Sequence, residues 1–131
     1  MNEIQEKSNY CLNCPVKPCS NKGCPLENNI PGFIKAIKEE DYKKAYEILS
    51  ETTVLEAVCG RICPHTKQCE GSCVRGIKSN PVSIGEMEAF IGDIAIKKNY
   101  KIACTHFDTI FSQKRIDIWK KLSYINAIRK W

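Results

Sequence analysis

The sequence predicts an all-α fold in which two cysteine-rich loops come together. Apolar residues recur at helical spacings of three and four, and no stretch of any length alternates as a strand would. Eight of the nine cysteines fall in two short segments that also hold proline and glycine, which are typical of loops. The 131 residues suffice for one domain and little more, so we expect a helical domain over residues 1–103 and a basic tail over residues 104–131.

Helices are expected between and after the two loops. Pro31 suits the first turn of a helix with an apolar side at Phe33, Ile34 and Ile37, and Asp41 is placed to cap the next one. The third begins behind a capping box of the Ser-x-x-Glu type, Ser83-Ile84-Gly85-Glu86, and runs to about residue 98. Residues 11–30 and 59–82 read as loops, because cysteine is mixed there with glycine and proline.

The net charge of +5 belongs to the tail. Residues 114–131 hold six basic side chains and one acidic one, so residues 1–113 are neutral overall and predict no nucleic-acid-binding face. Apolar residues recur there at every third position, which predicts an amphipathic helix over 114–130; they are Ile116, Trp119, Leu122, Ile125 and Ile128.

The cysteines are expected to be reduced. The sequence begins without a basic and apolar leader, and no apolar run approaches the roughly 18 residues that span a bilayer, so we expect a cytoplasmic protein that does not enter a membrane. Clustered cytoplasmic cysteines are more often metal ligands than disulfides.

The spacing of the cysteines favours iron–sulfur chemistry. The first group is Cys11-x2-Cys14-x4-Cys19-x4-Cys24, followed by Pro25. The second group is Cys59-x3-Cys63-x5-Cys69-x3-Cys73. Short loops of this kind wrap the corners of a cubane cluster, and two 4Fe–4S clusters would need eight ligands, which is the number of clustered cysteines.

Zinc is the main alternative for these cysteines. Four-cysteine zinc sites usually carry two Cys-x2-Cys pairs, and this chain has one, so iron is favoured. Inert core thiols would follow helical spacing and would not gather in proline-rich loops. His65 and His106 are isolated histidines, which we expect in loops or on the surface rather than as ligands.

Residues 11–99 resemble the N-terminal double-cluster domain of the glutamate synthase small (β) subunit and dihydropyrimidine dehydrogenase family. The motifs that carry the resemblance are Cys11-Leu-Asn-Cys14-Pro-Val-Lys-Pro-Cys19, Gly23-Cys24-Pro25-Leu26, Ile30-Pro31-Gly32-Phe33, Val58-Cys59-Gly60-Arg61-Ile62-Cys63-Pro64, Gln68-Cys69-Glu70-Gly71-Ser72-Cys73, Pro81-Val82-Ser83-Ile84-Gly85 and Glu88.

The resemblance implies an alpha-helical ferredoxin-like domain with two 4Fe–4S clusters and crossed ligation. The implied ligands of the first cluster are Cys11, Cys14, Cys19 and Cys73. Those of the second are Cys24, Cys63, Cys69 and Glu88.

The fourth ligand of the second cluster stays open between two residues. The count of clustered cysteines and the softness of thiolate favour Cys59, whereas the family pattern favours Glu88. Under the second assignment Cys59 is a nearby buried thiol. Cys104 lies beyond the family domain and is not expected to be a ligand.

The chain departs from the family after the cysteine domain. Relatives continue with a Gly-x-Gly-x-x-Gly turn that binds FAD, but residues 93–131 contain no glycine, so no FAD or NAD(P) site is expected in this chain. The resemblance therefore implies an electron-transfer module that relays single electrons for an NAD(P)H-dependent flavin oxidoreductase. The implied partner is a flavin-containing domain or subunit, with a ferredoxin or the glutamate synthase large subunit as further possibilities. A truncated, non-catalytic fragment and a zinc-stabilised binding module are the alternatives.

Overall fold

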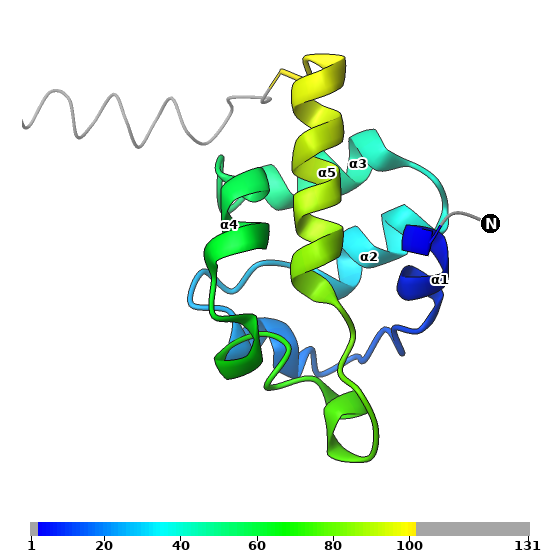
Figure 1. Cartoon of the computed structure of the whole chain (residues 1–131), viewed down its shortest axis with the longest axis vertical. Helices are drawn as coiled ribbons and strands as arrows, with labels where there is room; N and C mark the ends of the chain where they lie inside the picture. The colour runs from blue at the N-terminus through cyan, green and yellow to red at the C-terminus, as the bar shows by residue number, and fades with distance from the viewer. Residues whose placement is uncertain (1–2, 102–131) are drawn as a thin grey trace, which may run out of the picture.

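The computed structural model describes residues 3–101, and the helical fold class that the sequence predicts is confirmed there (Figure 1). This part of the chain contains no β-strand. Its α-helices are α1 (Glu3–Asn9), α2 (Ile30–Lys38), α3 (Tyr42–Ser50), α4 (Glu56–Ile62) and α5 (Ile84–Lys98). The helix predicted over 114–130, Cys104 and His106 lie outside the described residues. None of the helices within residues 3–101 has both the length and the hydrophobicity to cross a membrane.

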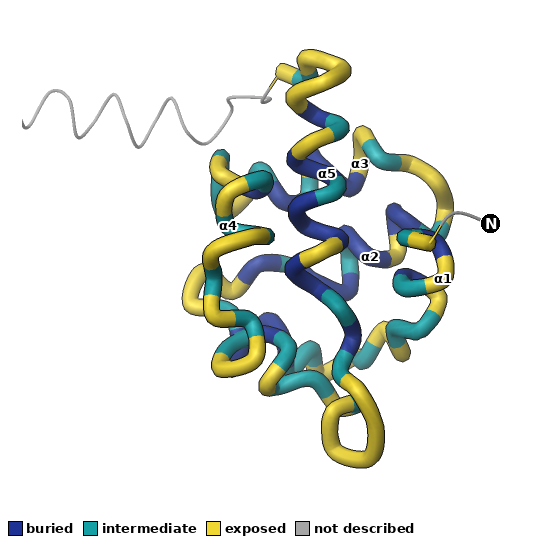
Figure 2. The backbone as a smooth tube through the Cα atoms, in the orientation of Figure 1, coloured by how far each residue is buried: buried dark blue, intermediate teal, exposed yellow. Residues whose placement is uncertain are grey.

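The core lies between α2, α3 and α5, and α5 runs through its centre (Figure 2). Phe33 and Ile37 from α2, Leu49 from α3, and Met87 and Ile91 from α5 are completely buried. Burial of each such side chain contributes about 1.5–3 kcal/mol before ordering costs. This core supports the cysteine loops from one side.

The residues predicted to begin α2 and α3 stand at the starts of these helices. Pro31 stands in the first turn of α2, where its missing N–H has no intrahelical partner to lose. Asp41 precedes α3, and its Oδ1 accepts a hydrogen bond from the backbone N–H of Lys44 at 3.0 Å.

The predicted capping box of α5 is wrong. Ser83 precedes the helix, but its side chain makes no capping hydrogen bond. The Glu70 carboxylate accepts from the Gly85 N–H at 3.1 Å instead, and Glu86 forms an ion pair with Lys7 of α1 at 2.5 Å. A side chain from the second cysteine loop thus satisfies a donor at the start of α5, which ties that loop to the core.

The loop expected over residues 59–82 begins too early, because residues 59–62 form the last turn of α4. Cys59 lies within α4, which packs directly beside α5 (Figure 1). A Cβ atom on Gly60 would lie 2.3 Å from the Ala89 nitrogen, and one on Gly92 would lie 2.3 Å from the Ala57 nitrogen. These glycines permit close contact between two helices, whereas in the sequence Gly60 reads as a loop residue.

The two cysteine loops meet at the end of the molecule that is lowest in Figure 1. The first loop includes a π-helical turn at Cys19–Gly23, and a Cβ on Gly23 would lie 2.7 Å from the Cys69 Cα, so the backbones of the two loops are in contact. Arg75 of the second loop stacks over the Tyr10 ring at 4.2 Å, and its Nε donates to the Tyr10 carbonyl at 3.1 Å. These contacts hold residues 10–24 against residues 69–75.

Candidate metal centres

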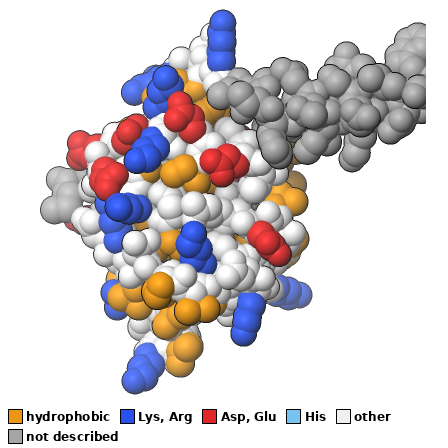
Figure 3. Space-filling view, turned by 180° about the vertical axis from the view of Figure 1, so that it is seen from behind, with side chains coloured by type: hydrophobic (Ala, Val, Ile, Leu, Met, Phe, Trp, Pro, Cys, Tyr) orange, Lys and Arg blue, Asp and Glu red, His pale blue; other side chains and the backbone are white. Residues whose placement is uncertain are grey.

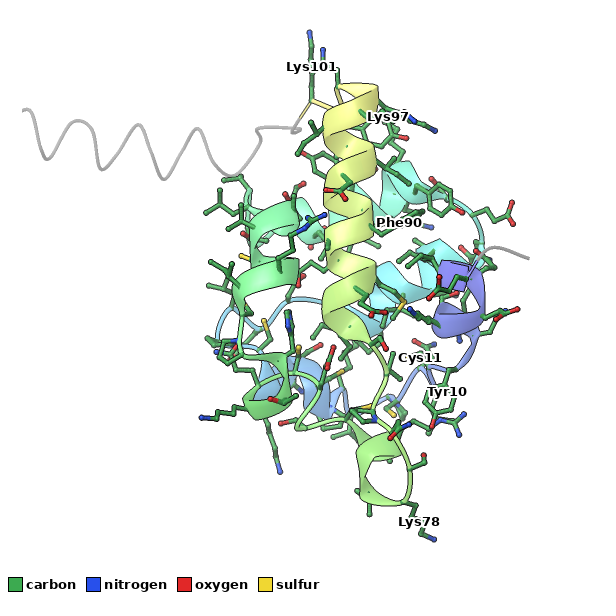
Figure 4. The ribbon with its side chains drawn as sticks, viewed as in Figure 1. Tyr10, Cys11, Lys78, Phe90, Lys97 and Lys101 are labelled. Carbon is green, nitrogen blue, oxygen red and sulfur yellow. The ribbon has the colours of Figure 1, made fainter. Side chains whose placement is uncertain are left out.

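The clustered cysteines surround two separate cavities at this end of the molecule. The first cavity is lined by Cys11, Cys14, Cys19 and Cys73, the four residues implied for the first cluster. The rest of its wall is largely apolar, with contributions from Ile30, Pro31, Ile34, Val82 and Ile84. Figure 4 shows sulfur atoms gathered at this end, with Cys11 next to Tyr10.

Backbone contacts fix the thiols of the first cavity. Lys38 of α2 donates to the Cys11 carbonyl at 2.8 Å, and the Cys24 N–H donates to the Cys19 carbonyl at 2.9 Å across the π-helical turn. Burial raises the pKa of the Cys19 thiol, and the nearby Cys11 and Cys73 raise it further, although hydrogen bonds from Ser20 oppose the effect. Thiols this close cannot all ionise unless a positive charge lies among them.

The second cavity brings together the residues implied for the second cluster. Its wall includes both candidates for the fourth ligand, together with four further polar side chains and some apolar ones. The thiols, the carboxyl and the polar side chains are Cys24, Cys63, Cys69, Glu88, Cys59, Asn28, Thr53, His65 and Gln68. Cys24 comes from the first loop, Cys63 ends α4, and Glu88 projects from α5.

Ionisation is strongly opposed in the second cavity. Burial raises the pKa of Cys69 to about 12, with smaller contributions from Glu70, Glu88 and Cys24. Burial also raises the pKa of Cys63, and the neighbouring Cys59 and Glu88 add to the effect. A cationic metal centre would reverse this balance, because bound iron favours the deprotonated ligands.

Glu88 is buried rather than solvated. Its exposed fraction is 9%, and burial raises the pKa of its carboxyl to about 7, with a contribution from the charge of Glu56. A buried carboxyl that faces three thiols in a cavity is a suitable ligand for a metal centre, since coordination compensates the lost hydration.

Cys59 lies close to one of the other thiols. It lies near enough to Cys63, four residues along the chain, to raise the pKa of that thiol, and its sulfur lies 3.9 Å from the Thr53 hydroxyl oxygen. Cys59 therefore borders the cavity from the same side as Cys63, whereas Glu88 approaches from a different helix.

The donor set and the cavity walls fit a polynuclear cluster. Within residues 3–101, no three His, Cys, Asp or Glu side chains converge closely enough to hold a single metal ion. The thiols are instead spread around cavities of about 20 Å³ and about 110 Å³, the first and second respectively.

Two unpaired polar atoms also point to a bound group in the second cavity. Asn28 Oδ1 and His65 Nε2 are buried and have no hydrogen-bond partner in the described part of the chain. Buried polar atoms normally find partners, and a group bound in this cavity would supply them. Nothing in the spacing of His65 or Asn28 marks either residue in the sequence, where an isolated histidine predicts only a loop or surface position.

Comparison with known proteins identifies the domain. The family described as dihydropyrimidine dehydrogenase domain II, 4Fe–4S cluster, matches residues 1–100. The chain belongs to this family. The resemblance noted in the sequence is thereby confirmed, and the domain is an iron–sulfur domain of the 4Fe–4S, electron-transfer kind.

Relatives of the 4Fe–4S domain occur within larger oxidoreductases. The glutamate synthase (NADPH) small chain of Azospirillum brasilense is 40% identical over 91 residues, which cover 69% of this chain and 19% of that protein. The Escherichia coli K12 small chain is 34% identical over 99 residues, covering 76% and 21%. The NAD-dependent dihydropyrimidine dehydrogenase subunit PreT of the same organism is 35% identical over 88 residues, covering 67% and 21%. The chain spans only 15–21% of the length of the relatives it matches.

Proposed function

We propose that the chain binds two 4Fe–4S clusters and relays single electrons between a flavin on a partner domain or subunit and a second acceptor. The reaction would belong to an NAD(P)H-dependent oxidoreductase of the glutamate synthase small-subunit type. The observation that carries the proposal is the sorting of the donors into two cavities, each with a complete set of four.

The ligand sets cross between the loops. Cys73 belongs to the second loop but lines the first cavity, and Cys24 belongs to the first loop but lines the second. In this proposal the first cluster is held by Cys11, Cys14, Cys19 and Cys73, and the second by Cys24, Cys63, Cys69 and Glu88. Crossed ligation would fasten the two loops to each other when the clusters bind.

Glu88 is the better candidate for the fourth ligand of the second cluster. Ligands of a cubane must reach its corners from several directions, and Cys59 lies against Cys63 on the same side of the cavity. The carboxyl of Glu88 comes from α5 and is buried against the same space. In this assignment Cys59 is a neighbouring thiol that contacts the ligand Cys63.

The clusters would supply one-electron redox chemistry, and the chain supplies their surroundings. The largely apolar wall of the first cavity reduces the access of water to its thiols, of which Cys19 is buried and the other three are partly exposed. The polar wall of the second offers hydrogen bonds, which favour the more negative, reduced state of a cluster.

The surface over the cavities supports docking by an electron-transfer partner. Residues 11–28 and 62–82 carry five basic and two acidic side chains, and exposed apolar side chains lie among them: Leu12, Val16, Leu26, Ile62, Val74 and Ile77. Figure 3 shows hydrophobic groups gathered at this end with Lys and Arg around them. Such a surface suits a flavoprotein with an acidic rim around an apolar contact.

Anaerobic purification followed by iron and sulfide analysis tests the proposal. We expect about eight iron and eight sulfide per chain, with broad visible absorption that bleaches on reduction. Glu88→Ala should lose much of the iron of one cluster, whereas Cys59→Ser should keep both. A colourless protein that binds zinc would contradict the proposal. If Cys59→Ser lost iron and Glu88→Ala did not, Cys59 would be the fourth ligand and Glu88 the neighbouring residue.

A further inference from the structure

His65 occupies the wall of the second cavity immediately after a proposed ligand. It begins a short 3-10 turn, His65–Lys67, separated from Cys63 only by Pro64. The cavity that its side chain lines is the one surrounded by the proposed ligands of the second cluster. Its Nε2 is buried and has no hydrogen-bond partner among the described residues.

The imidazole ring is held in place against the start of α5. A Cβ atom on Gly85 would lie 2.5–2.7 Å from three ring atoms, Cε1, Nε2 and Nδ1. Only a glycine therefore leaves room for the ring at this position. The ring is packed between α5 and the cavity, so it has little freedom to seek another partner.

The backbone around His65 is also fixed. Its N–H donates to the Cys63 carbonyl at 2.8 Å, and its carbonyl accepts from the N–H groups of Gln68, Glu70 and Gly71 at 3.0–3.2 Å. The same turn leads directly to Cys69. Movement of the His65 backbone would therefore disturb both flanking ligands.

A neutral or protonated imidazole can present Nε2–H as a donor, and an orphaned buried donor is costly unless an acceptor is supplied. The wall also holds Cys59 and the side chains of Asn28, Thr53 and Gln68, but none of them is hydrogen-bonded to Nε2. A bound cluster would bring sulfur acceptors into the same space. Hydrogen bonds to cluster or ligand sulfurs raise the reduction potential, because they stabilise the added negative charge.

We propose that His65 is a positioning residue that donates its Nε2–H to a sulfur of the second cluster and raises the reduction potential of that cluster. The inference rests on the proposed function, since it requires a cluster in the second cavity. The first cavity has no histidine in its wall, so the effect is confined to one of the two clusters.

The experiment uses the full chain purified anaerobically, with wild type, His65→Gln and His65→Leu compared. Gln keeps an N–H donor and Leu removes it, while Thr66→Ala serves as the control because Thr66 is exposed on the same turn. Redox titration followed by EPR gives the two potentials, and pulsed EPR of chain labelled with ¹⁵N-histidine detects a nitrogen coupled to the reduced cluster.

We expect a ¹⁵N coupling in the wild type that disappears in His65→Leu, together with a lower potential for one cluster only. His65→Gln should lie closer to the wild-type potential, and Thr66→Ala should match it. If His65→Leu fails to hold the second cluster while His65→Gln holds it, the requirement for a donor is supported.

The role of His65 would be overturned if His65→Leu bound two clusters with unchanged potentials and the wild type showed no ¹⁵N coupling. The proposed function would remain intact. Such a result would mean that water or the Asn28 amide satisfies the ring. Failure of the wild type to bind a second cluster would instead overturn the proposed function.

Discussion

The two cavities are built from the same pair of loops, yet their walls differ. Each is lined by four thiols, but the rest of the first, smaller wall is apolar except for Arg75, whereas the second, larger wall adds a carboxyl, an imidazole, a hydroxyl and two amides. The difference arises from the helices behind them, because α2 backs the first cavity and α4 and α5 contribute Cys59 and Glu88 to the second. If each cavity binds a cluster as proposed, one fold would place two similar clusters in unlike surroundings.

Removal of the metal is expected to have the largest effect and to reveal how far each cavity depends on it. Anaerobic chelation should lower Tm by at least about 10 °C and reduce the helical signal in circular dichroism, because the thiols of both loops lose their common partner. Amide exchange should rise first in residues 11–24 and 63–76, which surround the cavities. A melting curve unchanged after complete loss of iron would show that the loops fold without it.

Loosening the close packing of α4 against α5 is expected to change the second cluster and to leave the first unchanged. In Gly60→Ala the new methyl would meet the Ala89 backbone at 2.3 Å, so the helices must separate at a cost of about 1–3 kcal/mol in the free energy of unfolding. Gly76→Ala is the matched control, since its methyl would meet nothing closer than 3.6 Å. EPR should show a changed second cluster and an unchanged first one in Gly60→Ala; equal stability of the two variants would contradict this packing.

The exposed surface over the cavities should affect electron exchange more than stability. Ile77 and Ile96 are 77% and 73% exposed, but Ile77 lies in the second cysteine loop and Ile96 near the far end of α5. Ile77→Asp should slow reduction by an acidic one-electron donor such as reduced ferredoxin by roughly tenfold in stopped flow, by removing apolar contact and adding like charge. Ile96→Asp should leave the reduction rate unchanged. An equal decrease of the rate in both variants would show that the surface over the cavities is not the docking site.

The smallest effect is expected at the ion pair that links α4 to α5. Arg61 Nη2 lies 2.6 Å from Asp93 Oδ2, but both side chains are about half exposed, so water screens the pair. Arg61→Ala should change neither Tm nor the second cluster measurably. A marked loss of stability would mean that this pair, rather than the glycine contacts, holds α4 in position.

The sequence was informative where chemistry depends on residue type and spacing. The cysteine groups, the apolar sides of α2 and α5 and the Asp41 cap all follow from local patterns that the core then preserves. The crossed ligand sets, in which each cavity takes donors from both loops, were expected only from the resemblance to the family. Cysteine spacing alone does not choose between Cys59 and Glu88.

The features that the sequence analysis missed depend on contacts between distant segments. Gly60 was taken as a loop signal, but it permits helix contact, and the start of α5 is capped by Glu70 from another loop rather than by its own Ser83. His65 lies in the second cysteine loop, as the sequence predicts, but an isolated histidine carries no periodicity that would reveal a buried ring nitrogen. Its buried Nε2 becomes visible only when the turn is packed against Gly85.

The most direct test of the account is Mössbauer spectroscopy of ⁵⁷Fe-enriched protein with one cysteine of the second loop changed at a time. Cys73 and Cys69 are four residues apart, but they line different cavities. We predict that Cys73→Ser perturbs or loses the first cluster and leaves the second, with its non-cysteine ligand, intact. Cys69→Ser should do the opposite. If both variants damage the same cluster, the ligands do not cross between the loops, and the account is wrong.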